Sequence, residues 1–336
     1  MTTNQNFNLL GEGARPLTEH PGLRRAYRSD GMTLGIIAPL EGFAGPVPTM
    51  ADQSALVALM EDAGFAQYWV RDVPLLDPNF GDTGQVFDTF TYLGYLAATT
   101  DRIALGTASS VLPLRQPLDI AKAAASVDQL SGGRFTLGVA SGDRAVEFPA
   151  YGRRHDQRGE LFRESLAYLR AALENRFPTV RSPFGQLQGA DLLPKPTHER
   201  LPLFITGTSR QTVEWIADNG DGWLFYTLPP EQQEHNIKRW RRLTAAKGEP
   251  GWKPFNQATY FDLAEDPRQA PTPIHQGFRV GREPLIDLLH RWESIGIDQL
   301  MINLKQSTRP AREVLAEFGE YIVPLFPAGL SPVAAH

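Results

Sequence analysis

The sequence predicts a (β/α)8 barrel, a closed ring of parallel strands with a helix after each strand. Short apolar runs alternate with helical patterns eight times along the chain, and the runs are mostly apolar throughout rather than at every second residue. Such strands are typical of a parallel sheet buried on both faces, and eight repeats favour closure. An open doubly wound sheet is the alternative, but no Gly-x-Gly-x-x-Gly follows an early strand.

The repeating unit is clearest between Thr100 and Gly142. Ile103 to Gly106 is a short apolar run, and apolar residues from Ile120 to Leu130 follow helical spacing. Gly132-Gly133 ends this helix, and Phe135 to Val139 begins the next apolar run. A parallel strand pair requires a crossover connection of about this length. The stretch therefore predicts a strand, a crossover helix and a second strand.

The other elements follow in the same order. The predicted strands are Leu34 to Ala38, Ala66 to Val70, Ile103 to Gly106, Phe135 to Val139, Leu203 to Thr206, Gly222 to Tyr226, Ala258 to Leu263 and Gln299 to Leu304. The helices predicted after them are Met50 to Ala63, Val86 to Ala98, Ile120 to Leu130, Glu160 to Leu173, Gln211 to Asp218, Pro230 to Ala246, Glu283 to Ile295 and Ala311 to Pro324.

Two long connections interrupt the alternation. Phe177 to Leu201 follows the fourth strand and its helix, and Ala264 to Gly281 follows the seventh strand. Connections of this length are usually lids, binding loops or disordered segments, so the first is either a binding loop or a solvated insertion. We expect a barrel over residues 32–326, an N-terminal extension over 1–31 and a C-terminal tail over 327–336.

Composition fits one large enzyme domain and excludes several classes of partner. Lys and Arg number 33 against 38 Asp and Glu, a net charge of −5, so we expect neither nucleic acid nor a membrane as partner. The chain has no cysteine and no paired histidine spacing, so we expect no metal site. The first thirty residues lack the apolar core of a signal peptide, which favours a cytoplasmic location.

In a (β/α)8 barrel the chemistry lies at the carboxyl ends of the strands. Side chains suited to binding or catalysis follow the predicted strands at Glu41, Asp72, Ala108, Ser109, Ser141, Asp143, Arg144, Thr208, Ser209, Tyr226 and Asn303. The turn from Gly207 to Thr212 joins a strand to a helix, so its amides, its hydroxyls and Arg210 can bind an anion. The alternative is helix capping, since Thr208 and Gln211 have capping-box spacing.

Several motifs resemble those of the luciferase-like monooxygenases, the family of bacterial luciferase and its flavin-dependent relatives. The matching segments are Glu61-Asp62-Ala63-Gly64-Phe65, Tyr68-Trp69-Val70, Gly106-Thr107-Ala108, Val111-Leu112-Pro113, Asp128-Gln129-Leu130-Ser131, Gly133-Arg134-Phe135, Thr212-Val213-Glu214-Trp215 and Asp221-Gly222-Trp223. The resemblance covers roughly Met32 to Pro324 and is weakest between Arg176 and Arg200.

The resemblance implies a flavoprotein that uses FMN. Reduced FMN would come from a separate flavin reductase and react with oxygen, and a small organic substrate would be oxygenated. It also implies a homodimer and a mobile lid after the seventh strand, which places the lid at Ala264 to Gly281; its prolines stiffen it without giving it regular structure. The alternatives are hydride transfer with a deazaflavin coenzyme, flavin binding without turnover, and a barrel that acts on phosphorylated sugars.

The resemblance also assigns site residues. It puts Ser209 and Thr212 on the flavin phosphate, with Gly207, Thr208 and Arg210 in the same turn. It sets the ring against a cis peptide bond that corresponds here to Ala108-Ser109.

Two positions depart from the family pattern. Bacterial luciferase has a phosphate-binding arginine where this chain has Ser141, so Arg144 or Arg210 must supply the charge. It also has a histidine shortly after its Trp-Val pair, whereas here Val73 follows Asp72. The candidates for the catalytic acid or base are therefore Asp72, Asp143 and His155.

Overall fold

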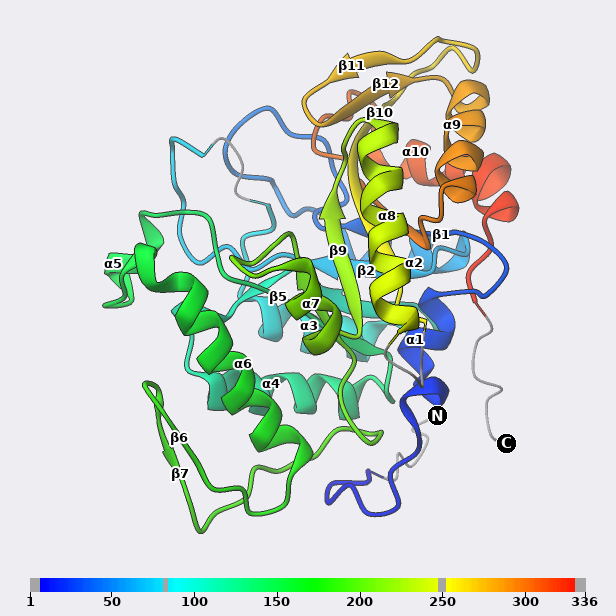
Figure 1. Ribbon diagram of the computed structural model, residues 1–336. Coiled ribbons are helices and arrows are strands. Elements are labelled where there is room, and N and C mark those ends of the chain that lie inside the picture. Colours follow the sequence, from blue (N-terminus) through cyan, green and yellow to red (C-terminus); the bar gives the residue numbers. More distant parts are fainter. Residues whose placement is uncertain (1–6, 81–83, 247–251, 330–336) are drawn as a thin grey trace.

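The computed structural model describes residues 7–80, 84–246 and 252–329, and within them eight parallel strands close into a barrel (Figure 1). The ring closes because the last strand pairs with the first, in the register Thr33 to Gln299 through Ile37 to Asn303. Its strands are β1 (Thr33–Ile37), β2 (Gln67–Val70), β3 (Ala104–Thr107), β5 (Phe135–Ala140), β8 (Leu203–Thr206), β9 (Gly222–Tyr226), β10 (Phe255–Leu263) and β13 (Gln299–Asn303).

The predicted (β/α)8 fold is confirmed, and each predicted strand is present. The seventh begins at Phe255, earlier than predicted, because its first residues pair with β9 from Phe255 opposite Trp223. A short strand, β4 (Ser110–Val111), follows β3 and pairs with the end of β5. The side chains of the strands are almost all buried, as a sheet covered on both faces requires.

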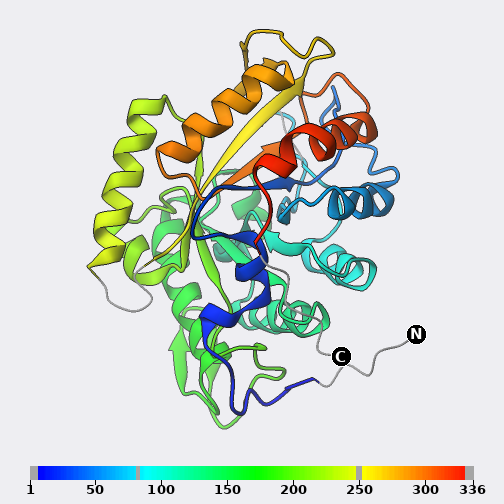
Figure 2. The same cartoon turned by 90° about the vertical axis from the view of Figure 1, so that its right-hand side faces the viewer.

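Helices surround the barrel, as Figure 2 shows from a second side. They are α2 (Gln53–Asp62), α3 (Thr89–Thr99), α4 (Pro117–Leu130), α6 (Arg158–Glu174), α7 (Val213–Asn219), α8 (Pro230–Ala245), α9 (Arg282–Ser294) and α10 (Ala311–Glu317), with the four-residue α5 (Glu147–Ala150) before α6. The predicted last helix is not continuous, since α10 passes into a π-helical turn at Phe318–Ile322 and a 3-10 turn at Val323–Leu325. None of the described helices is long and apolar enough to cross a membrane.

The described part of the N-terminal extension, residues 7–31, packs against the barrel. Its helical segments are a 3-10 turn at Leu17–Glu19 and α1 (Pro21–Ala26). The next residue, Tyr27, is buried in the barrel's interior cluster beside Phe204, and its hydroxyl accepts a hydrogen bond from Asn256 Nδ2 at 2.7 Å. The extension therefore covers one end of the barrel. Residues 1–6 of the extension and 330–336 of the tail lie outside the described residues.

The connection from Phe177 to Leu201 joins α6 to β8 and carries a small hairpin, β6 (Val180–Ser182) and β7 (Gly185–Leu187) (Figure 1). Its later residues pack on the N-terminal extension, where Lys195 N donates to Leu9 O at 3.0 Å and Glu199 N donates to Arg15 O at 2.9 Å. Because it precedes a strand, it lies at the amino ends of the barrel strands. It therefore lies at the opposite end of the barrel from the loops that form the carboxyl-end site.

The segment Ala264 to Gly281 has regular structure, contrary to the prediction. It forms an antiparallel hairpin of β11 (Thr272–Ile274) and β12 (Gly277–Val280), and β12 also pairs with β10. Pro273 is accommodated because β11 is an edge strand, where the amide that proline lacks is not needed. Asp262 on β10 accepts a hydrogen bond from Arg279 at 2.8 Å and fixes the base of the hairpin.

Candidate active site

A cavity of about 410 Å³ opens at the carboxyl ends of the barrel strands. This volume falls in the usual range for cofactor and small-molecule sites. Of the predicted catalytic and cofactor-binding residues, the structure brings together Asp72, Ala108, Ser109, Ser141, Asp143, Arg144, Gly207, Thr208, Ser209 and Arg210. Thr212 and His155 are not among the described residues that line it.

Small side chains line the cavity on three strands of the barrel. Ala108 follows β3, Ala140 ends the neighbouring β5, and Ala258 lies on β10 across the barrel. The Ala108-Ser109 peptide bond is cis, as the resemblance implies. The Ser109 hydroxyl contacts the Thr206 hydroxyl on β8, and Thr107 Oγ1 donates to Gly138 O at 2.7 Å. These contacts join the ends of β3, β5 and β8.

The turn after β8 contributes hydroxyl and cationic groups to the cavity. Gly207, Ser209 and Arg210 have positive φ values of 56°, 44° and 62°, so the chain turns sharply before α7. A Cβ atom on Gly207 would lie 3.4 Å from the Tyr226 ring, which leans over the turn. Ser209 Oγ donates to Thr206 O at 2.8 Å and accepts from Ser141 N at 3.3 Å. The loops that follow β5 and β8 are therefore joined by a direct hydrogen bond.

Thr212 lies on the exposed side of this turn. Its hydroxyl accepts a hydrogen bond from Trp215 N at 3.2 Å, which makes Thr212 the N-cap of α7. The expected cap, Thr208 with Gln211, is therefore wrong, because Thr212 caps the helix. Because a capping side chain is turned toward its own helix, Thr212 is held away from the cavity.

Among the described residues, four arginines line the cavity: Arg71, Arg144, Arg158 and Arg210. Arg158, at the start of α6, was not predicted, because nothing in the sequence distinguishes it from the other arginines of the polar run around His155. The start of α6 packs on the turn after β8, where a Cβ on Gly159 would lie 2.8 Å from Arg210 Cβ. Burial lowers the pKa of Arg158, and the nearby Arg210 charge lowers it further. Two like charges thus lie together where an anion can relieve their repulsion.

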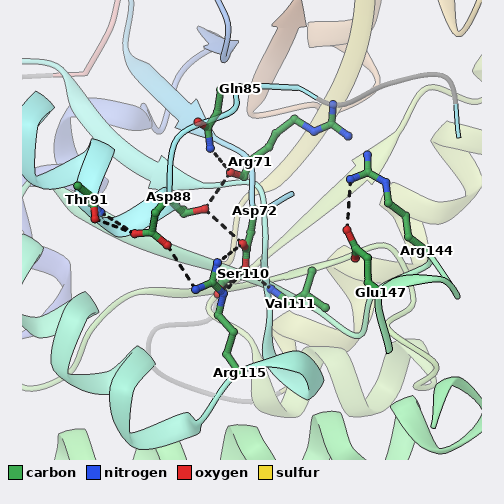
Figure 3. Close-up of polar contacts among 11 residues, drawn as sticks. Arg71, Asp72, Gln85, Asp88, Thr91, Ser110, Val111, Arg115, Arg144 and Glu147 are labelled. Atoms are coloured by element: carbon green, nitrogen blue, oxygen red, sulfur yellow. Dashed lines mark hydrogen bonds and ion pairs between the residues drawn. The ribbon is translucent and has the colours of Figure 1, made fainter. Parts of the chain in front are cut away.

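Asp72 lines the cavity, but its carboxylate is held by other groups (Figure 3). Arg115 Nη2 donates to Oδ1 at 2.5 Å and Arg115 Nε to Oδ2 at 2.9 Å, a bidentate pair, while Val111 N donates to Oδ2 at 3.0 Å. The hydroxyls of Ser110 and Thr89 approach the same carboxylate at 3.4 Å. A carboxylate with this many donors joins the end of β2 firmly to β4 and to Arg115, which suits positioning better than proton transfer.

The two other candidates for an acid or base differ in position. Asp143 is exposed at the cavity, and its negative charge acts on Arg158 and Tyr226. His155 packs edge-on against Phe148, with 4.9 Å between the ring centroids, and its Nδ1 is 3.4 Å from Arg158 Nη1. Burial and the Arg158 charge lower the pKa of His155.

Glu147 is a cavity residue that the sequence did not indicate. It is the first residue of α5, is 2% exposed, and lies 3.7 Å from Arg144 Nη1 (Figure 3). Burial raises the pKa of its carboxyl, and the Arg144 charge opposes the shift. The one sequence signal was its spacing of three residues from Arg144, which is too common to single it out.

The comparisons with known proteins agree with this geometry. The model of the luciferase-like monooxygenase family matches residues 32–277. The chain belongs to this family. Its members are oxidoreductases and monooxygenases, and the family includes both flavin-dependent and F420-dependent enzymes.

Three relatives illustrate the range of the family. The alkanal monooxygenase beta chain of Photorhabdus luminescens is 29% identical over 54% of this chain and 56% of that protein. The F420-dependent glucose-6-phosphate dehydrogenase of Beutenbergia cavernae is 30% identical over 57% of this chain and 56% of that protein. The monooxygenase RslO1 from Streptomyces bottropensis has the same fold, with a TM-score of 0.74 and 18% identity over 88% of this chain and 100% of that one.

Proposed function

We propose that this protein is an FMN-dependent monooxygenase, which uses reduced flavin and oxygen to oxygenate a small organic substrate. The observation that supports it best is that one cavity combines two kinds of lining. Ala108, Ala140 and Ala258 leave space for a flat ring, while Ser209, Arg158 and Arg210 gather hydroxyl and guanidinium groups around the turn after β8. Guanidinium groups bind phosphate well through charged hydrogen bonds.

The residues present therefore fit FMN, which supplies the redox chemistry when it is bound. Arg158, Arg210 and Ser209 would hold its phosphate and replace the arginine that bacterial luciferase has at the position of Ser141. The small side chains around the Ala108-Ser109 bond would lie against its ring. The hairpin of β11 and β12 reaches the cavity through Gln276 and would restrict the access of water.

A titration that compares FMN with riboflavin tests the phosphate assignment. Ser209→Ala combined with Arg210→Ala should weaken FMN binding by about a hundredfold or more, because each lost hydrogen bond to a charged group costs ~1.5 to 3 kcal/mol. Riboflavin, which lacks the phosphate, should bind nearly as well as to the wild type. Arg154→Ala is the matched control, since this arginine is 70% exposed and pairs with Asp156. Equal weakening of both ligands would refute the phosphate site.

Two further measurements separate the alternatives. Oxygen uptake that depends on substrate, with a flavin reductase supplying reduced FMN, is expected of a monooxygenase. Tight binding of F420 with weak binding of FMN would instead identify a deazaflavin enzyme, as in the F420-dependent relative. Flavin binding without oxygen uptake or hydride transfer for any substrate tried would favour a flavin-binding protein.

A further inference from the structure

The carboxyl of Glu147 is buried in the cavity wall with part of its hydrogen-bonding capacity unused. Its side chain is 3% exposed, and its Oε1 has no hydrogen-bond partner among the described residues. Arg144 Nη1 lies 3.7 Å from Oε1, which is an ion-pair distance and too long for a hydrogen bond. In the close-up view, the Glu147 carboxyl and the Arg144 guanidinium point toward each other (Figure 3).

Glu147 and Asp72 are two carboxyls of one cavity in opposite environments. Asp72 accepts both arms of the Arg115 guanidinium and a backbone N–H, so donors occupy both of its oxygens. Glu147 has a backbone N–H bond from Leu75, and Arg144 Nη1 lies 3.7 Å from its Oε1. Glu147 is therefore the carboxyl of the two whose surroundings leave an oxygen available to exchange a proton with a bound ligand.

The charged and titratable groups around Glu147 act in both directions. Arg144 favours its ionised form, whereas Asp143 on the same loop and Asp72 at the end of β2 disfavour it. Tyr151, at the end of α5, has a pKa raised by burial, with the Glu147 and Asp72 charges adding to the rise. Desolvation has the largest influence on the pKa of Glu147 and raises it, so the surroundings together favour the neutral carboxylic acid.

We propose that Glu147 is the proton donor and acceptor of this cavity, an inference that rests on the proposed function of the site. In the donating step the O–H bond of Glu147 breaks and its proton goes to a basic oxygen or nitrogen atom of the bound ligand. The electron pair stays on the carboxylate, which the neighbouring Arg144 guanidinium stabilises. Water at the cavity mouth returns the proton, so the group is unchanged after each cycle.

The first test needs no cofactor. A ¹³C NMR pH titration of the full chain, labelled at the glutamate carboxyl carbons, identifies Glu147 as the resonance that disappears in Glu147→Gln. Its midpoint should lie above the value of glutamate in model peptides, about 4.3. A midpoint at or below that value would overturn the proposal, because the cavity would then not favour the protonated carboxyl that the donating step requires.

The second test is the pH dependence of the oxidation of bound reduced FMN by oxygen, measured by stopped flow. Glu147→Gln should slow the reaction about a hundredfold and remove the alkaline limb of the profile, while the Kd for FMN changes less than twofold. Glu147→Asp keeps a carboxyl and should keep the limb. Glu160→Gln, an exposed carboxyl at the start of α6, is the control and should behave as the wild type.

The outcomes separate the inference from the function on which it rests. An unchanged pH profile in Glu147→Gln, with FMN bound normally, overturns the proton-transfer role and leaves the proposed function intact. A loss of FMN affinity with the pH limb retained would mean that Glu147 only positions Arg144. If the wild-type protein binds no FMN, the proposed function fails, and the NMR titration still decides whether Glu147 holds a proton.

Discussion

Replacement of Arg115 by methionine is expected to lower the free energy of unfolding by about 3 kcal/mol. The change leaves the Asp72 carboxylate, whose side chain is 1% exposed, without the cation that now donates to it at 2.5 and 2.9 Å. Loss of one partner from a buried pair typically costs ~3 to 5 kcal/mol. The Arg115 side chain is itself 22% exposed, so water can replace part of it, which places the cost at the lower end.

Equilibrium unfolding in urea, followed by tryptophan fluorescence, measures this cost. The double variant Asp72→Asn with Arg115→Met should recover part of the loss, because no unpaired charge is then buried and Asn Oδ1 can still accept from Val111 N. Arg154→Met is the control, since Arg154 and Asp156 are 70% and 63% exposed and such pairs contribute ~1 kcal/mol at most. A loss no larger than that of the control would refute the role given to Asp72.

Three more results are expected. Ala108→Phe should abolish FMN binding without unfolding the barrel, as judged by circular dichroism, because the added phenyl ring would occupy the space proposed for the flavin ring. Retained FMN affinity in a folded variant would exclude a flavin ring site beside Ala108. Burial, and to a smaller extent the nearby His20, lowers the pKa of His198 to about 4. The free energy of unfolding that neutral His198 contributes should therefore be fully present above pH 6.5 and be lost as the pH drops toward 4. His198→Asn should flatten this dependence in acid unfolding curves, and an equal slope would contradict it. Asp262→Asn should release Arg279 and speed tryptic cleavage after it, whereas unchanged cleavage would show that the hairpin needs no such anchor.

Most of the barrel could be predicted from the sequence, because each strand and helix is specified by a local apolar pattern. The strand at Ile103 to Gly106 and the crossover helix after it could be predicted, because the apolar run and the helical spacing that indicate them are visible in neighbouring residues. The hairpin at Thr272–Val280 was missed because its pairing with β10 joins residues that are distant in the chain, and its prolines suggested an irregular loop.

The candidate site likewise has features that the sequence indicates and features that only the tertiary structure shows. The strand ends at Ala108 and Ser209 could be placed from the sequence and its family resemblance, because in a barrel every strand end reaches the same face. The sequence alone did not show that Arg115 neutralises Asp72, or that Glu147 is left partly unpartnered in the cavity wall. Those properties depend on which side chains pack together from separate loops, and on how much water that packing excludes. Burial and pairing set the charge state of a carboxyl, so only the tertiary structure could distinguish these two.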